Sequence, residues 1–195
     1  MPYFKKNERP APDPKIWDEL KTHSDGLGGA MLDVTELDAT KNDGYLIKGC
    51  PAYLDFSTKT AHVVKAALVV AGGTTSAPRV SKNHLYKVGD FVYVSGDAVT
   101  ISAIDTSNSA YDVLTLSAAC TGATAGAYLE QASAAGASPS PKFLANAING
   151  ESKYDIRGGE RITPVLWIFQ LIKKSALPYE ASPARLADML GFKFA

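Results

Sequence analysis

The feature that most constrains the fold is the stretch of residues 44–94. Short runs rich in β-branched and aromatic residues follow one another there, and glycine, proline, serine and threonine separate them. β-Patterned runs with turn residues at such short intervals favour a small all-β barrel or sandwich. Nothing in this stretch suggests an active site. The runs are residues 45–48, 52–56, 61–70, 79–81 and 90–94.

The clearest β-hairpin follows this stretch. Residues 98–104 and 111–116 both alternate between apolar and polar side chains, and a polar, turn-rich segment separates them. The alternation places Leu114 and Leu116 on one face of the second strand. Residues 126–131 are expected to form the last strand of this unit.

The sequence predicts a mainly β protein whose β-barrel or sandwich carries an extended N-terminal arm and a C-terminal strand with a short helix. Alanine, serine and proline dominate one segment late in the chain, and side chains this small bury too little area to fix a structure of their own. We therefore place a linker there. The expected parts are an arm (1–31), a β domain (32–131), a linker (132–142) and a C-terminal strand–helix segment (143–195).

The N-terminal arm contains four prolines in its first 14 residues, followed by one or two turns with helical apolar spacing. It carries too little apolar surface to fold alone. Two interpretations stay open. The arm is either a frayed tail with Trp17 packed on the body, or an anchor that docks on a partner through Tyr3, Phe4 and Trp17.

The C-terminal segment combines a dense apolar run, residues 165–171, with a short helix. Ser182 is the expected N-cap, Pro183 occupies the first helical position and Gly191 ends the helix. Because this C-terminal segment is so apolar, it is expected to pack on its own chain or on a neighbouring subunit. The candidates for a subunit interface are Val165, Trp167, Phe169, Leu186, Met189, Phe192 and Phe194.

Charge and hydropathy exclude some classes of partner. Lys plus Arg and Asp plus Glu number 20 each, so the chain lacks the basic excess that proteins binding nucleic acid usually show. The run KVGDFV at residues 87–92 resembles the entry to SH3-like barrels, but its glycine is explained by a tight turn. The N-terminus lacks the apolar core of a signal peptide, and the apolar runs are too short to span a bilayer. We expect synthesis in a cytoplasm and no membrane insertion.

No constellation for catalysis, cofactor binding or metal binding stands out. Cys50 and Cys120 are expected to be small buried apolar residues, and the three histidines show no metal-ligand spacing. The glycine-rich segment 71–75 is expected to be a loop between strands. It lacks the downstream Lys-Ser/Thr of a phosphate-binding loop, and no helical pattern follows it. A small acidic group is expected to be a solvated segment rather than a cation site; its members are Asp33, Glu36 and Asp38.

The order of these segments resembles a known family. GCPAYLDF, the turn STKT and the run AHVVKAALVV are followed by KVGDFVYV and by VTISAIDTSNSAYDVLTLSAACTGATAGAYL. With the C-terminal LIKKSALPYEASPARLADMLGFKF, this order is similar to head fibre or head decoration proteins of tailed bacteriophages, especially crAss-like phages of gut bacteria. The resemblance covers residues 44–195 and rests on composition and order, without a catalytic signature.

The resemblance implies a non-enzymatic structural protein on the outside of the virion. Such a protein forms a homodimer or homotrimer and is anchored to capsid or auxiliary capsid subunits. The absence of sustained heptads predicts a compact protrusion rather than a coiled-coil shaft.

A carbohydrate-binding or adhesin module, on the virion or a cell surface, is the alternative. Trp17, Trp167 and the tyrosines would then stack on a surface glycan. The two roles are compatible, because a head decoration protein can also bind mucus or a host surface.

Overall fold

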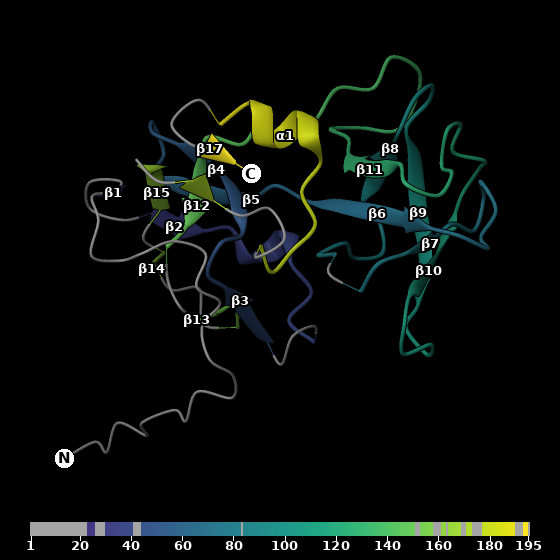
Figure 1. The fold of residues 1–195 in the computed structure, drawn as a ribbon, viewed down its shortest axis with the longest axis horizontal. Helices are drawn as coiled ribbons and strands as arrows, with labels where there is room; N and C mark the ends of the chain where they lie inside the picture. Colours follow the sequence, from purple (N-terminus) through teal and green to yellow (C-terminus); the bar gives the residue numbers. More distant parts are fainter. Residues whose placement is uncertain are drawn as a thin grey trace.

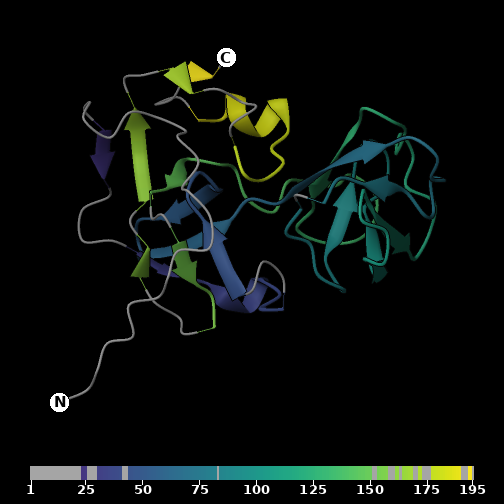
Figure 2. The ribbon, with the colours of Figure 1, turned by 60° about the horizontal axis from the view of Figure 1, so that its bottom comes forward.

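The computed structural model describes residues 23–25, 30–40, 44–82, 84–150, 153–157, 161–162, 164–168, 171–172, 177–189 and 193–194. The chain is mainly β, as expected, with a barrel and a short C-terminal helix. It forms two lobes, a sheet-based body and a closed β-barrel, which lie beside each other in both ribbon views (Figures 1 and 2).

The body is built on a seven-stranded sheet with the order β1-β15-β12-β4-β5-β2-β14. Five of its six strand pairs are antiparallel, and β2 runs parallel to β5. Strands from the two ends of the described chain therefore share one sheet. The strands are β1 (His23–Asp25), β2 (Ala30–Leu32), β4 (Pro51–Asp55), β5 (Thr60–Val63), β12 (Ala147–Asn149), β14 (Arg161–Ile162) and β15 (Pro164–Ile168).

Smaller elements complete the body. The 3-10 helix η1 (Val34–Glu36) follows β2, and the helix α1 (Pro183–Ala187) begins at the expected cap, where the Ser182 side chain accepts a hydrogen bond from the Arg185 amide. Two two-stranded sheets also belong to the body. They pair β3 (Tyr45–Ile47) with β13 (Lys153–Asp155), and β16 (Leu171–Ile172) with β17 (Lys193–Phe194).

The barrel closes in the order β10-β7-β6-β11-β8-β9. Its β9–β10 hairpin is the one that the sequence predicts, and Leu114 and Leu116 both face the core. The glycine-rich segment 71–75 connects two strands, as expected. The strands are β6 (Ala66–Val70), β7 (Arg79–Val80), β8 (Phe91–Tyr93), β9 (Val99–Asp105), β10 (Asp112–Leu116) and β11 (Tyr128–Gln131).

Each lobe has its own hydrophobic core. Every buried residue of the barrel cluster comes from residues 67–129, including Tyr86, Ile101 and Leu129. The two clusters of the body come from both sides of that segment. Leu85 is the exception, because it belongs to the barrel's stretch of sequence but packs into the core of the body.

The strand pairings divide the chain differently from the expected parts. The expected β domain, residues 32–131, contains β4 and β5, which pair within the body rather than the barrel. The expected run 61–70 is two strands, because the chain passes from one lobe to the other at Val64 and Lys65. The expected linker is an ordered loop, held by β-bridges between Ala132 and Pro141 and between Ala98 and Gly136.

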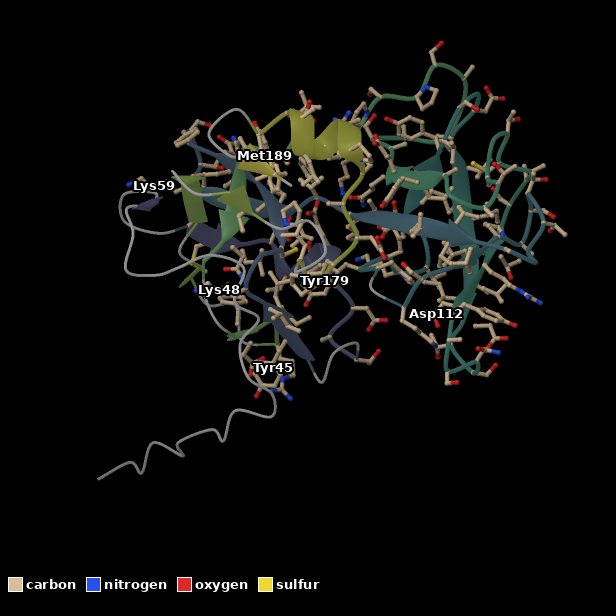
Figure 3. The ribbon with its side chains drawn as sticks, viewed as in Figure 1. Tyr45, Lys48, Lys59, Asp112, Tyr179 and Met189 are labelled. Atoms are coloured by element: carbon tan, nitrogen blue, oxygen red, sulfur yellow. The ribbon has the colours of Figure 1, made fainter. Side chains whose placement is uncertain are left out.

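The structure shows where several of the candidate residues for a C-terminal subunit interface lie. Leu186 and Met189 are buried in the body, where they pack with Val64, Ala145 and Ile148. They are therefore occupied within their own chain, and Figure 3 shows Met189 beside α1. Phe194 packs partly buried against the same cluster. Val165 and Trp167 lie on β15, which pairs on both sides and is not a sheet edge. Tyr3, Phe4, Trp17, Phe169 and Phe192 lie outside the described residues.

Candidate functional site

The polar side chains that concentrate most charge lie where the barrel meets the body, around η1. We call this region the seam and define it by Asp33, Glu36, His62, Lys65 and Asp90 with the side chains that bond to them. Lys65 comes from the segment between the lobes, η1 and β5 come from the body, and Asp90 immediately precedes β8 of the barrel.

Two lysines donate to the carbonyl groups at the end of η1. The ammonium of Lys65 donates to the Glu36 carbonyl, and that of Lys87 donates to the Thr35 carbonyl. The last carbonyl groups of a helical turn lack partners within the turn, and cationic side chains satisfy them well. These two lysines therefore hold the backbone of η1, independently of the side chains that η1 carries.

Lys65 is the buried charge of the seam. Its ammonium is fully buried and lies 2.7 Å from Asp90 Oδ2. Burial lowers the pKa of Lys65 because it removes water from the charged form, and the carboxylate of Asp90 opposes that shift. Breaking such a pair leaves an uncompensated charge in a dry environment, so this contact ties the lobes together.

Asp90 is the acidic residue of the KVGDFV run. Gly89 has a φ of 93°, in the left-handed region that favours glycine, and the turn it permits places Asp90 inside the protein. The carboxylate also accepts from the Lys87 amide at 3.0 Å and from Gln131 Nε2 at 3.2 Å. The run thus places Asp90 in the contact between the lobes. Its glycine permits a tight turn, as the sequence predicts.

A second group of the seam gathers three possible metal ligands. His62 Nδ1 lies 3.2 Å from Glu36 Oε2 and 3.7 Å from Asp33 Oδ2. One ligand atom from each residue lies within 4.8 Å of the other two. Lys142 pairs with the other oxygen of Glu36 at 2.8 Å, so the group is partly charge-compensated.

Aromatic rings continue this group on the body. The ring of His62 stacks on Phe143 at a centroid distance of 4.4 Å, and Tyr53 stacks on Phe143 at 5.6 Å. All three rings are partly exposed. Planar rings beside carboxylates and an ammonium are the elements that sugar-binding surfaces use, because they offer stacking together with hydrogen-bond donors and acceptors.

Glu130 makes a further polar contact between the lobes. It accepts a hydrogen bond from the Ser182 hydroxyl and lies 3.3 Å from Arg185 Nε, both in the α1 region of the body. It also accepts from the Tyr93 hydroxyl at 3.2 Å. Desolvation, with the nearby Glu130 charge, raises the pKa of Tyr93 to about 12. α1 is thus attached to the barrel as well as to the body.

The barrel contains a buried His–Asp pair that resembles part of a catalytic site. His84 Nε2 lies 3.0 Å from Asp112 Oδ2, and Nδ1 accepts a hydrogen bond from the Tyr86 amide at 3.2 Å. Both ring nitrogens are therefore engaged within the protein, and Lys82 holds the other oxygen of Asp112 at 2.5 Å. Figure 3 places Asp112 on the barrel. The arrangement anchors the segment after β7 and leaves no ring nitrogen to act as a base.

Both cysteines are buried, as the sequence predicts, and the structure shows them free. Burial raises the pKa of each thiol, and the thiolate is the reactive form of cysteine. Cys50 and Cys120 therefore pack as small apolar residues.

The site was only partly visible in the sequence. The sequence groups Asp33, Glu36 and Asp38 as a small acidic segment, but Asp38 accepts hydrogen bonds from Thr40 and stays outside the site. The third member of the group is His62, 26 residues away from Glu36. Strand alternation places His62 and Val63 on opposite faces, which the structure confirms, yet it gives no partner for His62.

Comparison with known protein families, with curated proteins and with solved structures finds no match for this chain. Within the described residues, no helix has the length and apolar character needed to cross a membrane.

Proposed function

We propose that this protein is a structural virion protein, a head fibre or decoration protein on the outside of a phage capsid. The observation that carries the proposal is the arrangement of the two lobes. The first and last described strands, β1 and β17, both belong to the body, whereas the barrel is an insert with its own core (Figure 1). Such a layout suits a body that anchors and a barrel that is displayed.

The chemistry of the described residues supports a binding role over catalysis. His84 is held in structural contacts and both cysteines are buried, so these three side chains are unsuited to act as base or nucleophile. The barrel's basic side chains are engaged as well. Lys82 pairs with Asp112, Lys87 binds the body and Arg79 lies over the ring of Tyr111. A displayed barrel of this kind offers little to a polyanion such as nucleic acid.

The body is the proposed anchoring side. Its exposed large apolar side chains include Phe56, at 65% exposure, and Met31, at 44%. Both lie at one end of the sheet, because Met31 pairs with Thr60 and Phe56 follows the partner of Thr60 on β4. Exposed aromatic side chains are frequent anchors of protein interfaces. The capsid or auxiliary capsid protein is the proposed partner, and a homodimer or homotrimer the proposed assembly state.

Binding to capsid particles tests which lobe docks. Particles lacking this protein are mixed with the full chain, with a Phe56→Ser variant and with a Val88→Ser variant, and the bound fraction is measured by co-sedimentation. Val88 is the matched control, since it is 58% exposed on the barrel. We expect the wild type and Val88→Ser to bind and Phe56→Ser to bind at least tenfold more weakly. Absence of binding by the wild type contradicts the proposal. Loss of binding in Val88→Ser alone would show that the barrel, rather than the body, docks on the capsid.

A carbohydrate-binding module is the second candidate, and the aromatic group of Tyr53, His62 and Phe143 favours it. A glycan array with the full chain tests this role, with Phe143→Ala as the variant that removes the central ring. Hits that vanish in Phe143→Ala support a sugar site on the body. An array without signal above background excludes glycans as partners.

A further inference from the structure

In the group of Asp33, Glu36 and His62, the two oxygens of each carboxylate have different partners. Asp33 Oδ1 accepts hydrogen bonds from the amide and the hydroxyl of Thr35, at 3.1 and 2.6 Å. Glu36 Oε1 is held by Lys142 at 2.8 Å. The remaining oxygens, Asp33 Oδ2 and Glu36 Oε2, both turn toward His62 Nδ1. One oxygen of each carboxylate thus fixes its orientation while the other faces a common point.

The distances among the inner atoms fit ligands of a single ion. His62 Nδ1 is 3.2 Å from Glu36 Oε2 and 3.7 Å from Asp33 Oδ2. An ion with bonds of about 2.1 Å separates adjacent ligands by roughly 3 to 3.5 Å in octahedral or tetrahedral geometry. The first distance lies in this range and the second slightly exceeds it, and all three ligand atoms lie within 4.8 Å of one another, so the group must contract to close around an ion.

The surroundings hold the imidazole in place. Its ring stacks on Phe143 with an interplanar angle of 17°, which fixes the plane that contains Nδ1. Partners outside the ligand set orient the three ligands, and such partners commonly tune metal affinity by 10- to 100-fold. Thr35, Lys142 and Phe143 fill these supporting positions.

We propose that Asp33, Glu36 and His62 form a binding site for a divalent first-row transition ion, represented by Zn²⁺. One imidazole nitrogen with two carboxylate oxygens suits this class, whereas Mg²⁺ and Ca²⁺ prefer oxygen ligands alone. The three side chains are 18%, 28% and 11% exposed for His62, Asp33 and Glu36, so solvent reaches the group and water completes the coordination.

Charged side chains around the site partly compensate one another. Two carboxylates face the ion, and the ammonium of Lys142 offsets part of their charge. His62 Nδ1 also lies within hydrogen-bonding distance of Glu36 Oε2. The direct test is therefore whether a metal ion binds at these three residues.

The ion would act on the seam. Asp33 and Glu36 belong to η1 and its N-cap, and His62 belongs to β5, so a shared ion joins η1 to the sheet. The carbonyls of the same η1 receive Lys65 and Lys87 from the side of the barrel. Fixing η1 consequently stabilises the position of the barrel on the body.

Calorimetric titration of the full chain with Zn²⁺, after removal of metal with a chelator, tests the site. Asp33→Asn is the main variant, because asparagine keeps the oxygen that caps η1 and replaces the inner oxygen with an amide. His62→Gln removes the imidazole, and Asp38→Asn is the matched control outside the site. We expect one ion per wild-type chain, unchanged affinity in Asp38→Asn and at least tenfold weaker binding in the other two variants.

Two further measurements separate a metal site from a folding effect. Zn²⁺ should raise the unfolding temperature of the wild type by several degrees and leave that of Asp33→Asn unchanged. Co²⁺ should give visible absorption bands in the wild type that Zn²⁺ abolishes. The proposal is overturned if the wild type takes up no Zn²⁺ at about 100 μM, or if folded Asp33→Asn and His62→Gln bind it as tightly as the wild type.

Discussion

The barrel draws all of its strands from residues 66–131, whereas the body draws its main sheet from strands on both sides of that insert. In the barrel, β9 pairs with the strand that follows it after a short polar loop. In the body, β4 pairs with β12 and β2 pairs with β14, across the whole length of the barrel. The two lobes therefore differ in how far apart along the chain their contacts lie.

This difference has a consequence for folding. Closing a long loop costs more chain entropy than closing a short one, and contacts between distant residues form slowly. The body must bring together segments separated by more than 60 residues, unless the barrel folds first and brings its own ends together. The register Ala66–Glu130 between β6 and β11 does this. We infer that the barrel is the more autonomous lobe.

The largest expected effect comes from removing one half of the discontinuous lobe. A chain that ends at Lys142 loses β12, β14 and β15, so the body loses the strands that join its two sides. The barrel keeps all six strands and its core. We expect amide hydrogen exchange to show full loss of protection in the body and persistent protection in the barrel. Loss of protection in both lobes would make the barrel dependent on the body.

A smaller effect is expected where the lobes are joined. Lys65→Met removes the buried ammonium that pairs with Asp90, and we expect a loss of about 3 kcal/mol in the free energy of unfolding. Asp90→Asn in the same chain should recover part of the loss, because it removes the unpaired charge. The measurement is urea unfolding followed separately in each lobe.

Lys82→Met is the control for that prediction. Its ammonium is partly exposed and pairs with Asp112 within the barrel, away from the seam. We expect a loss of about 1 kcal/mol, confined to the barrel transition. Equal effects of the two lysine variants would show that the seam does not couple the lobes.

The smallest effect concerns a turn of the body. Asp55 accepts hydrogen bonds from the hydroxyl and amide of Ser57 at 2.6 and 2.8 Å, and these lower its pKa to about 2. A lowered carboxyl pKa stabilises the fold above the unfolded value, near 4, and this contribution disappears as the pH falls through about 2. We expect Ser57→Ala to raise the pKa of Asp55. Carboxyl NMR titration measures it, with Asp105 as the internal reference, and a midpoint that stays near 2 contradicts the assignment.

The same difference between the lobes decides what the sequence reveals. The β9–β10 hairpin and the capped start of α1 are predicted because their signals lie within a few residues, as in the alternation around Leu114 and the pair Ser182–Pro183. The membership of β4 and β5 in the body is not predictable in this way. Their patterns are ordinary strand patterns, and only their distant partners assign them to a lobe.

The candidate site follows the same rule. The spacing of Asp33 and Glu36 is visible along one turn, but the approach of His62 and Lys142 depends on how β2, β5 and the loop before β12 pack. Leu85 shows this limit in the cores, because its apolar character is evident while its insertion into the opposite lobe is a tertiary property. Buried Lys65 has no sequence signal at all, since lysine is rarely found inside proteins.

The pairing of β6 with β11 has a last consequence, for the exchange of whole domains. The chain enters the barrel at Ala66 and leaves it beside Glu130, on neighbouring strands roughly 5 Å apart. The polypeptide joins the barrel to the body at two adjacent points, while the seam and Leu85 add further contacts between the lobes. A different domain with closely spaced ends would meet the same chain geometry if it replaced those contacts, so exchange of the barrel offers a route to new surfaces on an unchanged body.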